Sequence, residues 1–194
     1  TLISIPRDLY VNDRKINSVY AAYGIQEQVK VVGEVLGLSI QNYVLVDMYV
    51  FRDLIDLLGG VDIVLKEDLV DPSYKVCEDG LCSSLYYHAG PHHLDGTAAL
   101  RVARSRHSTS DYSRAERQQL ILQALMAELK AMDVTDLSTL GSLAHTALAA
   151  TESNLGLQQV LTYALKYKDF DVSGGNVIST ANVLAANPVP VDYV

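Results

Sequence analysis

Short apolar runs alternate along the chain with amphipathic stretches that repeat at helical spacing. In the first third of the chain, a run of β-branched residues ends at Pro6. A later run has valines three and four residues apart, as on one face of a helix. The pattern predicts strand, helix, strand, helix and strand over residues 1–5, 25–36, 42–48, 49–58 and 61–65. This order is typical of an α/β protein, and we expect a three-layer α-β-α arrangement with a central mixed sheet flanked by helices.

The second half predicts fewer strands and more helices. Residues 66–95 are predicted to be rich in loops, after which Asp95 caps a helix that begins near Thr97. Ser113-Arg114-Ala115-Glu116 has the form of a capping box and predicts a helix that runs to about Met132. Further helices are expected over residues 137–149 and 155–165, and a last strand over 177–183. Since no repeat or linker is visible, we expect one domain over residues 1–194.

Composition places the chain among folded, globular proteins. Its 194 residues are 49% hydrophobic and 20% charged, which excludes disordered and collagen-like chains. No apolar stretch approaches the roughly 20 residues that a bilayer requires. The sequence opens at Thr1 inside a predicted strand, so we expect that it continues a longer upstream part.

Charge distribution gives the main chemical signal. A net charge of −8 argues against a nucleic-acid partner. Five of the eight arginines nevertheless fall within seventeen residues: Arg101, Arg104, Arg106, Arg114 and Arg117. The planar guanidinium matches phosphate and carboxylate geometry, so the cluster suggests one focused anion site. Surface ion pairs with the many acidic residues are the alternative.

The start of the predicted long helix adds to this signal. Arg114 would lie in its first turn, where free amide groups and the helix dipole favour an anion. Arg114, Arg117 and Gln118 share one face by their spacing. These side chains and the arginines before the helix could therefore converge on one phosphate.

Two cysteines flank a short acidic turn. Cys77 and Cys82 have the spacing of a small disulfide that closes a loop, which would imply an oxidising compartment. Free thiols are one alternative. The other is a zinc site that combines the cysteines with the three nearby histidines, His88, His92 and His93.

Several segments together resemble one known family. They are Ser4-Ile5-Pro6-Arg7-Asp8; Lys15-Ile16-Asn17 with Tyr20-Ala21-Ala22-Tyr23-Gly24; Val46-Asp47 with Phe51; Leu54-Ile55-Asp56-Leu57-Leu58-Gly59-Gly60-Val61; Leu94-Asp95-Gly96 with Ala99-Leu100; and Arg104-Ser105-Arg106 through Asp111-Tyr112-Ser113-Arg114 to Arg117-Gln118-Gln119. In this order and at these intervals they resemble the LytR-CpsA-Psr (LCP) family over residues 1 to about 123.

The resemblance implies a phosphotransferase of the bacterial cell surface. LCP proteins are membrane-anchored and act at the extracytoplasmic face of the membrane. With Mg²⁺ assisting, they move teichoic acid, capsule or related polysaccharide from an undecaprenyl pyrophosphate carrier to peptidoglycan. By this resemblance, the chain is a single catalytic domain that lacks its N-terminal strands and membrane helix.

The same resemblance implies the site residues. The positions that match those holding the pyrophosphate are Arg7, Arg104, Arg106, Arg114 and Gln118, and Arg7, Arg106 and Arg114 are the catalytic ones among them. The prenyl tail would lie in an apolar tunnel between sheet and helices. Positioned arginines and a metal lower the barrier of phosphoryl transfer by neutralising charge on the transferred group.

The chain departs from the family pattern at a few positions. The metal-linked aspartates of the family lie upstream of the Ser4–Asp8 segment, Val102 replaces a frequent aromatic residue, and Ser113 replaces a frequent glycine. Asp8 and Asp111 are the candidates for orienting an arginine or activating the acceptor hydroxyl, with caps and ion-pair partners as the alternative roles. Arg117 is a possible supporting residue.

Two other functions stay open at this point. The domain could be a non-catalytic receptor for polyprenyl phosphate or cell-wall glycan, since the same arginines would serve binding alone. The cysteines and histidines could instead form an extracytoplasmic zinc hydrolase, which stoichiometric zinc would reveal.

Overall fold

The computed structural model describes residues 2–78, 80–105, 111–131, 141, 145, 151–166 and 175–178. Its helices are α1 (Ile16–Tyr23), α2 (Ile25–Leu36), α3 (Met48–Leu57), α4 (Gly96–Arg104), α5 (Asp111–Ala131) and α7 (Leu157–Lys166). Its strands are β1 (Leu2–Ser4), β2 (Tyr10–Val11), β3 (Arg14–Lys15), β4 (Val44–Leu45), β5 (Val61–Leu65), β6 (Leu69–Glu78), β7 (Leu81–Tyr87), β8 (Gly90–Leu94), β9 (Glu152–Ser153) and β10 (Gly175–Val177).

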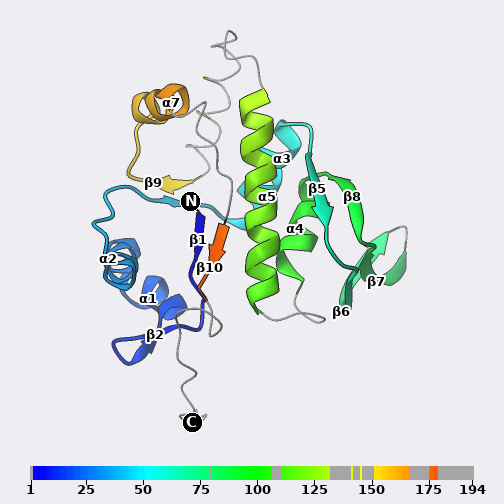
Figure 1. Cartoon of the computed structure of the whole chain (residues 1–194), viewed down its shortest axis with the longest axis horizontal. Helices are drawn as coiled ribbons and strands as arrows, with labels where there is room; N and C mark the ends of the chain where they lie inside the picture. Colours follow the sequence, from blue (N-terminus) through cyan, green and yellow to red (C-terminus); the bar gives the residue numbers. More distant parts are fainter. Residues whose placement is uncertain are drawn as a thin grey trace.

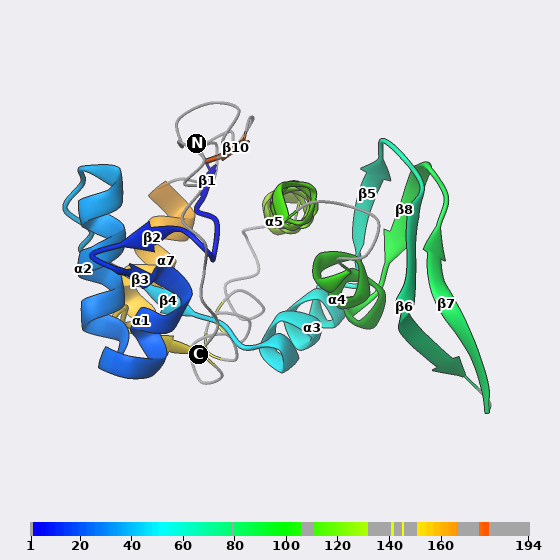
Figure 2. The same ribbon diagram turned by 90° about the horizontal axis from the view of Figure 1, so that it is seen from below.

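Strand pairing is mixed, and the predicted α/β class is confirmed. Within the described residues the strands form five two-stranded sheets, of which β1–β10 is parallel and the other four are antiparallel. The long helix α5 lies between β1–β10 on one side and β5–β8 on the other (Figure 1). Seen from below, α1, α2 and α7 lie on one side of α5, and the β6–β7 hairpin projects on the opposite side (Figure 2).

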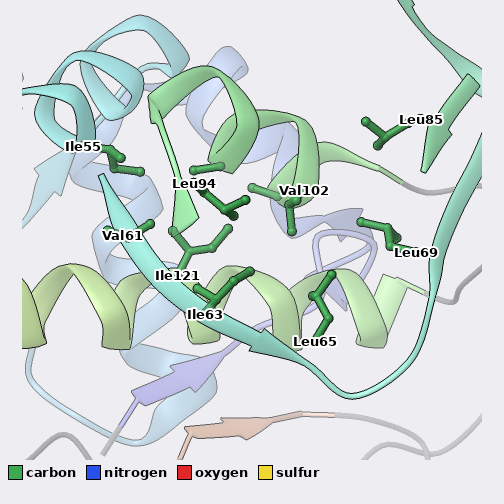
Figure 3. Packing of buried hydrophobic residues seen from close by; sticks show 11 residues of the cluster. Ile55, Val61, Ile63, Leu65, Leu69, Leu85, Leu94, Val102 and Ile121 are labelled. Carbon is green, nitrogen blue, oxygen red and sulfur yellow. The ribbon is translucent and has the colours of Figure 1, made fainter. Parts of the chain in front are cut away.

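The main hydrophobic core lies between α5 and β5. Alternate residues of β5 point inward, so Val61, Ile63 and Leu65 are buried while the residues between them are exposed. Ile121 of α5 is 0% exposed and points toward Leu94 and Val61 (Figure 3). A second, smaller cluster of Ile16, Val19 and Val31 joins α1 to α2.

Several predicted elements agree closely with the structure. The bounds of α2 and β5 are those predicted, and α3 begins and ends one residue earlier than predicted. Asp95 caps α4 as predicted, because its carboxylate accepts a hydrogen bond from Ala98 N at 2.7 Å. The same device appears at α3, where Asp47 Oδ1 accepts from Tyr49 N and Val50 N, each at 2.8 Å.

The prediction of loops over residues 66–95 is wrong, because β6, β7 and β8 occupy this segment. The hairpin projects into solvent and lacks the alternation that marks a half-buried strand. Strand β6 contains Pro72, which lies where the β6–β7 register shifts between Asp71 and Lys75. Irregularities of this kind are where sheets tolerate proline.

Two short elements near the N-terminus are absent from the prediction. The β2–β3 hairpin turns through Asn12 and Asp13, whose φ angles of 52° and 61° are accessible at low cost to Asn and Asp. Its strands are two residues each, too short for a hydrophobic period to show. Helix α1 follows directly, since Ile16 comes after the last residue of β3.

The predicted start of the long helix is also wrong. Helix α5 begins at Asp111, so Ser113 lies inside its first turn and does not cap it. Ser113 and Glu116 instead border a cavity beside β5. The predicted helix over 137–149 lies outside the described residues except at 141 and 145, and the predicted strand over 177–183 lies outside them beyond 178. Among the described residues, no helix has the length and apolarity to cross a membrane.

Candidate anion-binding site

One cavity brings together four of the residues predicted to hold a pyrophosphate. It has a volume of about 800 Å³ and is bordered by Arg7, Arg104, Arg114 and Gln118. Arg7 follows β1 directly after Pro6, and Arg104 is the last residue of α4. Arg114 and Gln118 are four residues apart on α5 and therefore share a face.

Arg7 is oriented by the chain that follows it. Its carbonyl oxygen accepts a hydrogen bond from Asn17 N at 3.1 Å, which ties β1 to the start of α1. Its Nε lies 3.8 Å from Asp8 Oδ2, and the other oxygen of Asp8 lies 3.2 Å from Lys15 Nζ. The Arg7 side chain is 49% exposed, so it is open to a ligand.

Arg104 and Arg114 approach the cavity from two helices. Arg104 is exposed at the end of α4, and Arg114 is partly buried near the start of α5. Gln118 Nε2 donates to Ala103 O at 3.1 Å and so joins the two helices beside the arginines. A ligand here would meet two guanidinium forks near a helix N-terminus, an arrangement that favours a phosphate.

Arg117 has a different role from the arginines of the cavity. It is 8% exposed and donates to Val102 O at 3.1 Å and to Ser105 O at 2.6 Å, which satisfies carbonyl groups at the end of α4. Burial, and then the charge of Arg114, lower the pKa of its guanidinium. It borders a separate cavity of about 580 Å³, and we assign it a structural role.

Most of the remaining wall of the 800 Å³ cavity is apolar. The apolar residues come from β1, α3, α4, α5 and the segments beside them: Ile5, Pro6, Val46, Met48, Phe51, Leu100, Ala103, Ala115 and Leu122. Asp47 is the single carboxylate among the described residues that border this cavity. The cavity therefore offers cationic hydrogen-bond donors and apolar surface to the same ligand.

Some predicted residues are not brought into this site. Arg106 lies outside the described residues, and so does the side chain of Asp111, although Asp111 begins α5. Asp8 does not border the cavity and acts as an ion-pair partner of Lys15 and Arg7. In the described part of the chain, no three His, Cys, Asp or Glu side chains are placed to hold a metal.

The cysteines and histidines do not form a common site in the described residues. Cys77 and Cys82 form a disulfide at the tip of the β6–β7 hairpin. His92 Nε2 lies 2.7 Å from the carbonyl oxygen of His88. His93 lies between Asp62 Oδ1, at 2.8 Å from Nδ1, and Gly59 O, at 3.0 Å from Nε2. The sulfur atoms are bonded to each other, which removes both thiolates from the predicted zinc site.

Asp47 was not predicted as a site residue, and the resemblance implied an apolar tunnel without naming the residues that form its wall. An aspartate directly before an amphipathic helix signals a cap, and this signal alone does not indicate that the helix starts at a cavity. Phe51, Leu100 and Leu122 have the spacing of core residues on three separate helices. Only the packing of these helices turns the residues into one wall.

Comparisons with known proteins agree on one family. The model of the LytR_cpsA_psr family matches residues 1–185. A polyisoprenyl-teichoic acid–peptidoglycan teichoic acid transferase of Bacillus subtilis, TagV, is 31% identical over 179 residues, which are 87% of this chain and 44% of that protein. The chain spans about half the length of the curated relatives it matches.

Solved structures show the same similarity. The crystal structure of B. subtilis TagV superposes with a TM-score of 0.73 and 29% identity, covering 91% of this chain and 68% of that one. A structure of TagT bound to LIIa-WTA superposes with a TM-score of 0.67 and 25% identity, covering 91% and 65%.

Proposed function

Because the chain belongs to the LytR-CpsA-Psr family, we propose that it transfers a glycopolymer from a polyprenyl pyrophosphate carrier to peptidoglycan. The observation that carries the proposal is the cavity with Arg7, Arg104, Arg114 and Gln118 beside an apolar wall. The similar TagV is named for teichoic acid transfer from a polyisoprenyl carrier to peptidoglycan. Teichoic acid, capsule and related polysaccharides share the linkage that this cavity would recognise.

The two kinds of surface in the cavity suit the two parts of the carrier. Three arginines supply planar, permanently charged donors for the oxygens of the pyrophosphate. Met48, Phe51 and Leu122 supply apolar surface for the prenyl units next to it. A hydrophilic nucleotide would use the arginines but would leave the apolar wall exposed to water.

The transfer is a substitution at phosphorus. The oxygen of an acceptor hydroxyl bonds to the phosphorus that carries the glycan, while the bond from this phosphorus to the bridging oxygen breaks. Polyprenyl monophosphate is the leaving group, and the arginines neutralise the charge that grows on it. This requires no covalent intermediate with the protein.

We propose that Asp47 accepts the proton of the acceptor hydroxyl. Its Oδ1 is held by two amide groups of α3, and its Oδ2 has no hydrogen-bond partner among the described residues. A carboxylate that borders the cavity and is fixed by a helix N-terminus can accept a proton at a defined position. Asp8 is less suited, since Lys15 and Arg7 share its two oxygens.

Mg²⁺ is part of this proposal as a partner that would neutralise pyrophosphate charge. The described residues place no three suitable donors together, so no step above depends on the metal. We further propose that the reaction occurs at the extracytoplasmic face of the bacterial membrane, with an anchor upstream of this chain. The Cys77–Cys82 disulfide supports a location outside the reducing cytoplasm.

A transfer assay with the full-length protein tests the proposal. The donor is a short-chain polyprenyl pyrophosphate-linked glycan, the acceptor is peptidoglycan, and the product is covalently attached glycan. We expect turnover by the wild type and a large loss in Arg104→Ala and in Arg114→Ala. Arg14→Ala is the matched control, because Arg14 does not border the cavity and instead stacks on Tyr23. Binding of the donor without any transfer would favour the non-catalytic receptor.

A further inference from the structure

A buried carboxylate links the β6–β7 hairpin to the end of α4. Asp71 is 2% exposed. Its Oδ1 accepts hydrogen bonds from Ser73 N at 3.1 Å, Ser73 Oγ at 2.6 Å and Tyr74 N at 3.1 Å. Its Oδ2 accepts from Ser105 Oγ at 2.9 Å. The hairpin thus fixes one oxygen of the carboxylate and directs the other oxygen toward Ser105.

Ser105 is held from three directions. It is 1% exposed and follows α4 directly. Its N donates to Arg101 O at 3.0 Å, its carbonyl oxygen accepts from Arg117 at 2.6 Å, and its hydroxyl donates to Asp71. This fixes the backbone at the point where the chain leaves α4. The residues on either side of Ser105 in the sequence are Arg104 and Arg106.

Two opposite charges are buried around this serine. Arg117 is 8% exposed, and burial and the charge of Arg114 lower its pKa, while Asp71 and two glutamates act in the opposite direction. Burying a charge is costly unless hydrogen bonds and an opposite charge compensate it. Asp71, Ser105 and Arg117 form a chain of hydrogen bonds that meets this requirement.

We infer that Asp71 is a positioning residue of the anion-binding cavity, which acts by fixing Ser105 directly after Arg104 at the end of α4. The inference rests on the proposed function for the ligand of the cavity, but the contact itself does not depend on that function. Side chains that bind a transferring phosphoryl group must be held within a fraction of an ångström. The end of a helix frays unless side chains hold it, so Arg104 at the end of α4 requires such an anchor.

The chain offers a matched control for Asp71. Asp68 belongs to the same region and also accepts hydrogen bonds, from Ala89 N at 2.7 Å and from Tyr86 Oη at 3.0 Å. None of these bonds reaches α4. A change at Asp68 therefore perturbs the base of the hairpin without releasing Ser105.

The first part of the test measures the contact alone in the full-length protein. Amide hydrogen exchange at Ser105 is compared in the wild type, Asp71→Asn, Ser105→Ala and Asp68→Asn. We expect at least about tenfold faster exchange at this amide in the first two variants and no change in Asp68→Asn. Unchanged exchange in both Asp71→Asn and Ser105→Ala would overturn the inference, whatever the ligand of the cavity.

The second part measures the affinity for farnesyl pyrophosphate by calorimetry. Asp71→Asn keeps the shape of the side chain but removes its charge and replaces one accepting oxygen with a donating amide group, so the side chain can no longer accept from both the hairpin and Ser105. We expect about tenfold weaker binding in Asp71→Asn and in Ser105→Ala, and wild-type affinity in Asp68→Asn. In the background of Arg104→Ala, the change at Asp71 should have no further effect, because Asp71 acts through this arginine.

The two parts of the test distinguish failure of the positioning role from failure of the proposed function. If Asp71→Asn weakens binding equally with and without Arg104, its effect is general destabilisation and the positioning role is wrong. If the wild type itself does not bind farnesyl pyrophosphate, the proposed function fails, and the exchange measurement decides whether Asp71 anchors the end of α4.

Discussion

Replacing Arg117 by methionine should cost a large share of the stability of the fold. Methionine keeps the length of the side chain but donates no hydrogen bonds. The change leaves the carbonyl oxygens of Val102 and Ser105 without their bonds of 3.1 and 2.6 Å in a buried place. Hydrogen bonds to a charged group contribute about 1.5–3 kcal/mol each, and removing the buried charge offsets part of the loss. We therefore expect a net loss of about 2–4 kcal/mol.

Urea denaturation measures this loss. With a slope of about 2 kcal/mol per M, the midpoint should fall by roughly 1–2 M. Arg52→Met is the matched control: Arg52 pairs with Asp53 at 2.7 Å on the surface, and we expect little change in the urea midpoint. Equal midpoint shifts in Arg117→Met and Arg52→Met would refute the structural role assigned to Arg117.

Three further predictions concern the reaction, a pH effect and the disulfide. Asp47→Asn keeps a good helix cap but no proton acceptor, so turnover in the transfer assay should fall about 100-fold or more while pyrophosphate affinity stays unchanged; equal loss of both would contradict the role of Asp47. The hydrogen bond with Asp62, and then the one with Gly59 O, raise the pKa of His93, which adds stability below its unfolded pKa that is lost as pH rises through the folded value. The stability advantage of the wild type over His93→Gln, measured by urea denaturation, should therefore be larger near about pH 5.5 than near about pH 8.5. Cys77→Ser with Cys82→Ser should lower the free energy of unfolding by at most about 2 kcal/mol, since the bridged residues are five apart, and should leave affinity for farnesyl pyrophosphate unchanged.

Elements with a clear hydrophobic period could be predicted from the sequence, and those without one could not. Helix α2 buries one face and is flanked by glycines, so its bounds follow from spacing and caps. The β6–β7 hairpin is stabilised by its pairing and disulfide and projects from the body, so its strands show no such period. The two-residue strands β2 and β3 carry too few positions for any period.

The residues of the candidate site could likewise be predicted only in part from the sequence. The resemblance placed Arg7, Arg104, Arg114 and Gln118 together, and these residues do border one cavity. Helical spacing alone could not separate Arg117 from Arg114 and Gln118, because it predicts a shared face but not that Arg117 is buried beside a different cavity. Asp71 gave no signal at all, since its partner Ser105 is 34 residues away and only the folded chain brings them together.

Binding of farnesyl pyrophosphate to the full-length protein, with and without Mg²⁺, tests the central claim most directly. The variants are Arg104→Ala and Arg114→Ala, with Arg14→Ala as the control outside the cavity. We predict binding that is weakened at least about tenfold in both cavity variants and unchanged in the control, as expected for the loss of a charge-assisted hydrogen bond. Wild-type affinity in both Arg104→Ala and Arg114→Ala would contradict the assignment of this cavity to the pyrophosphate.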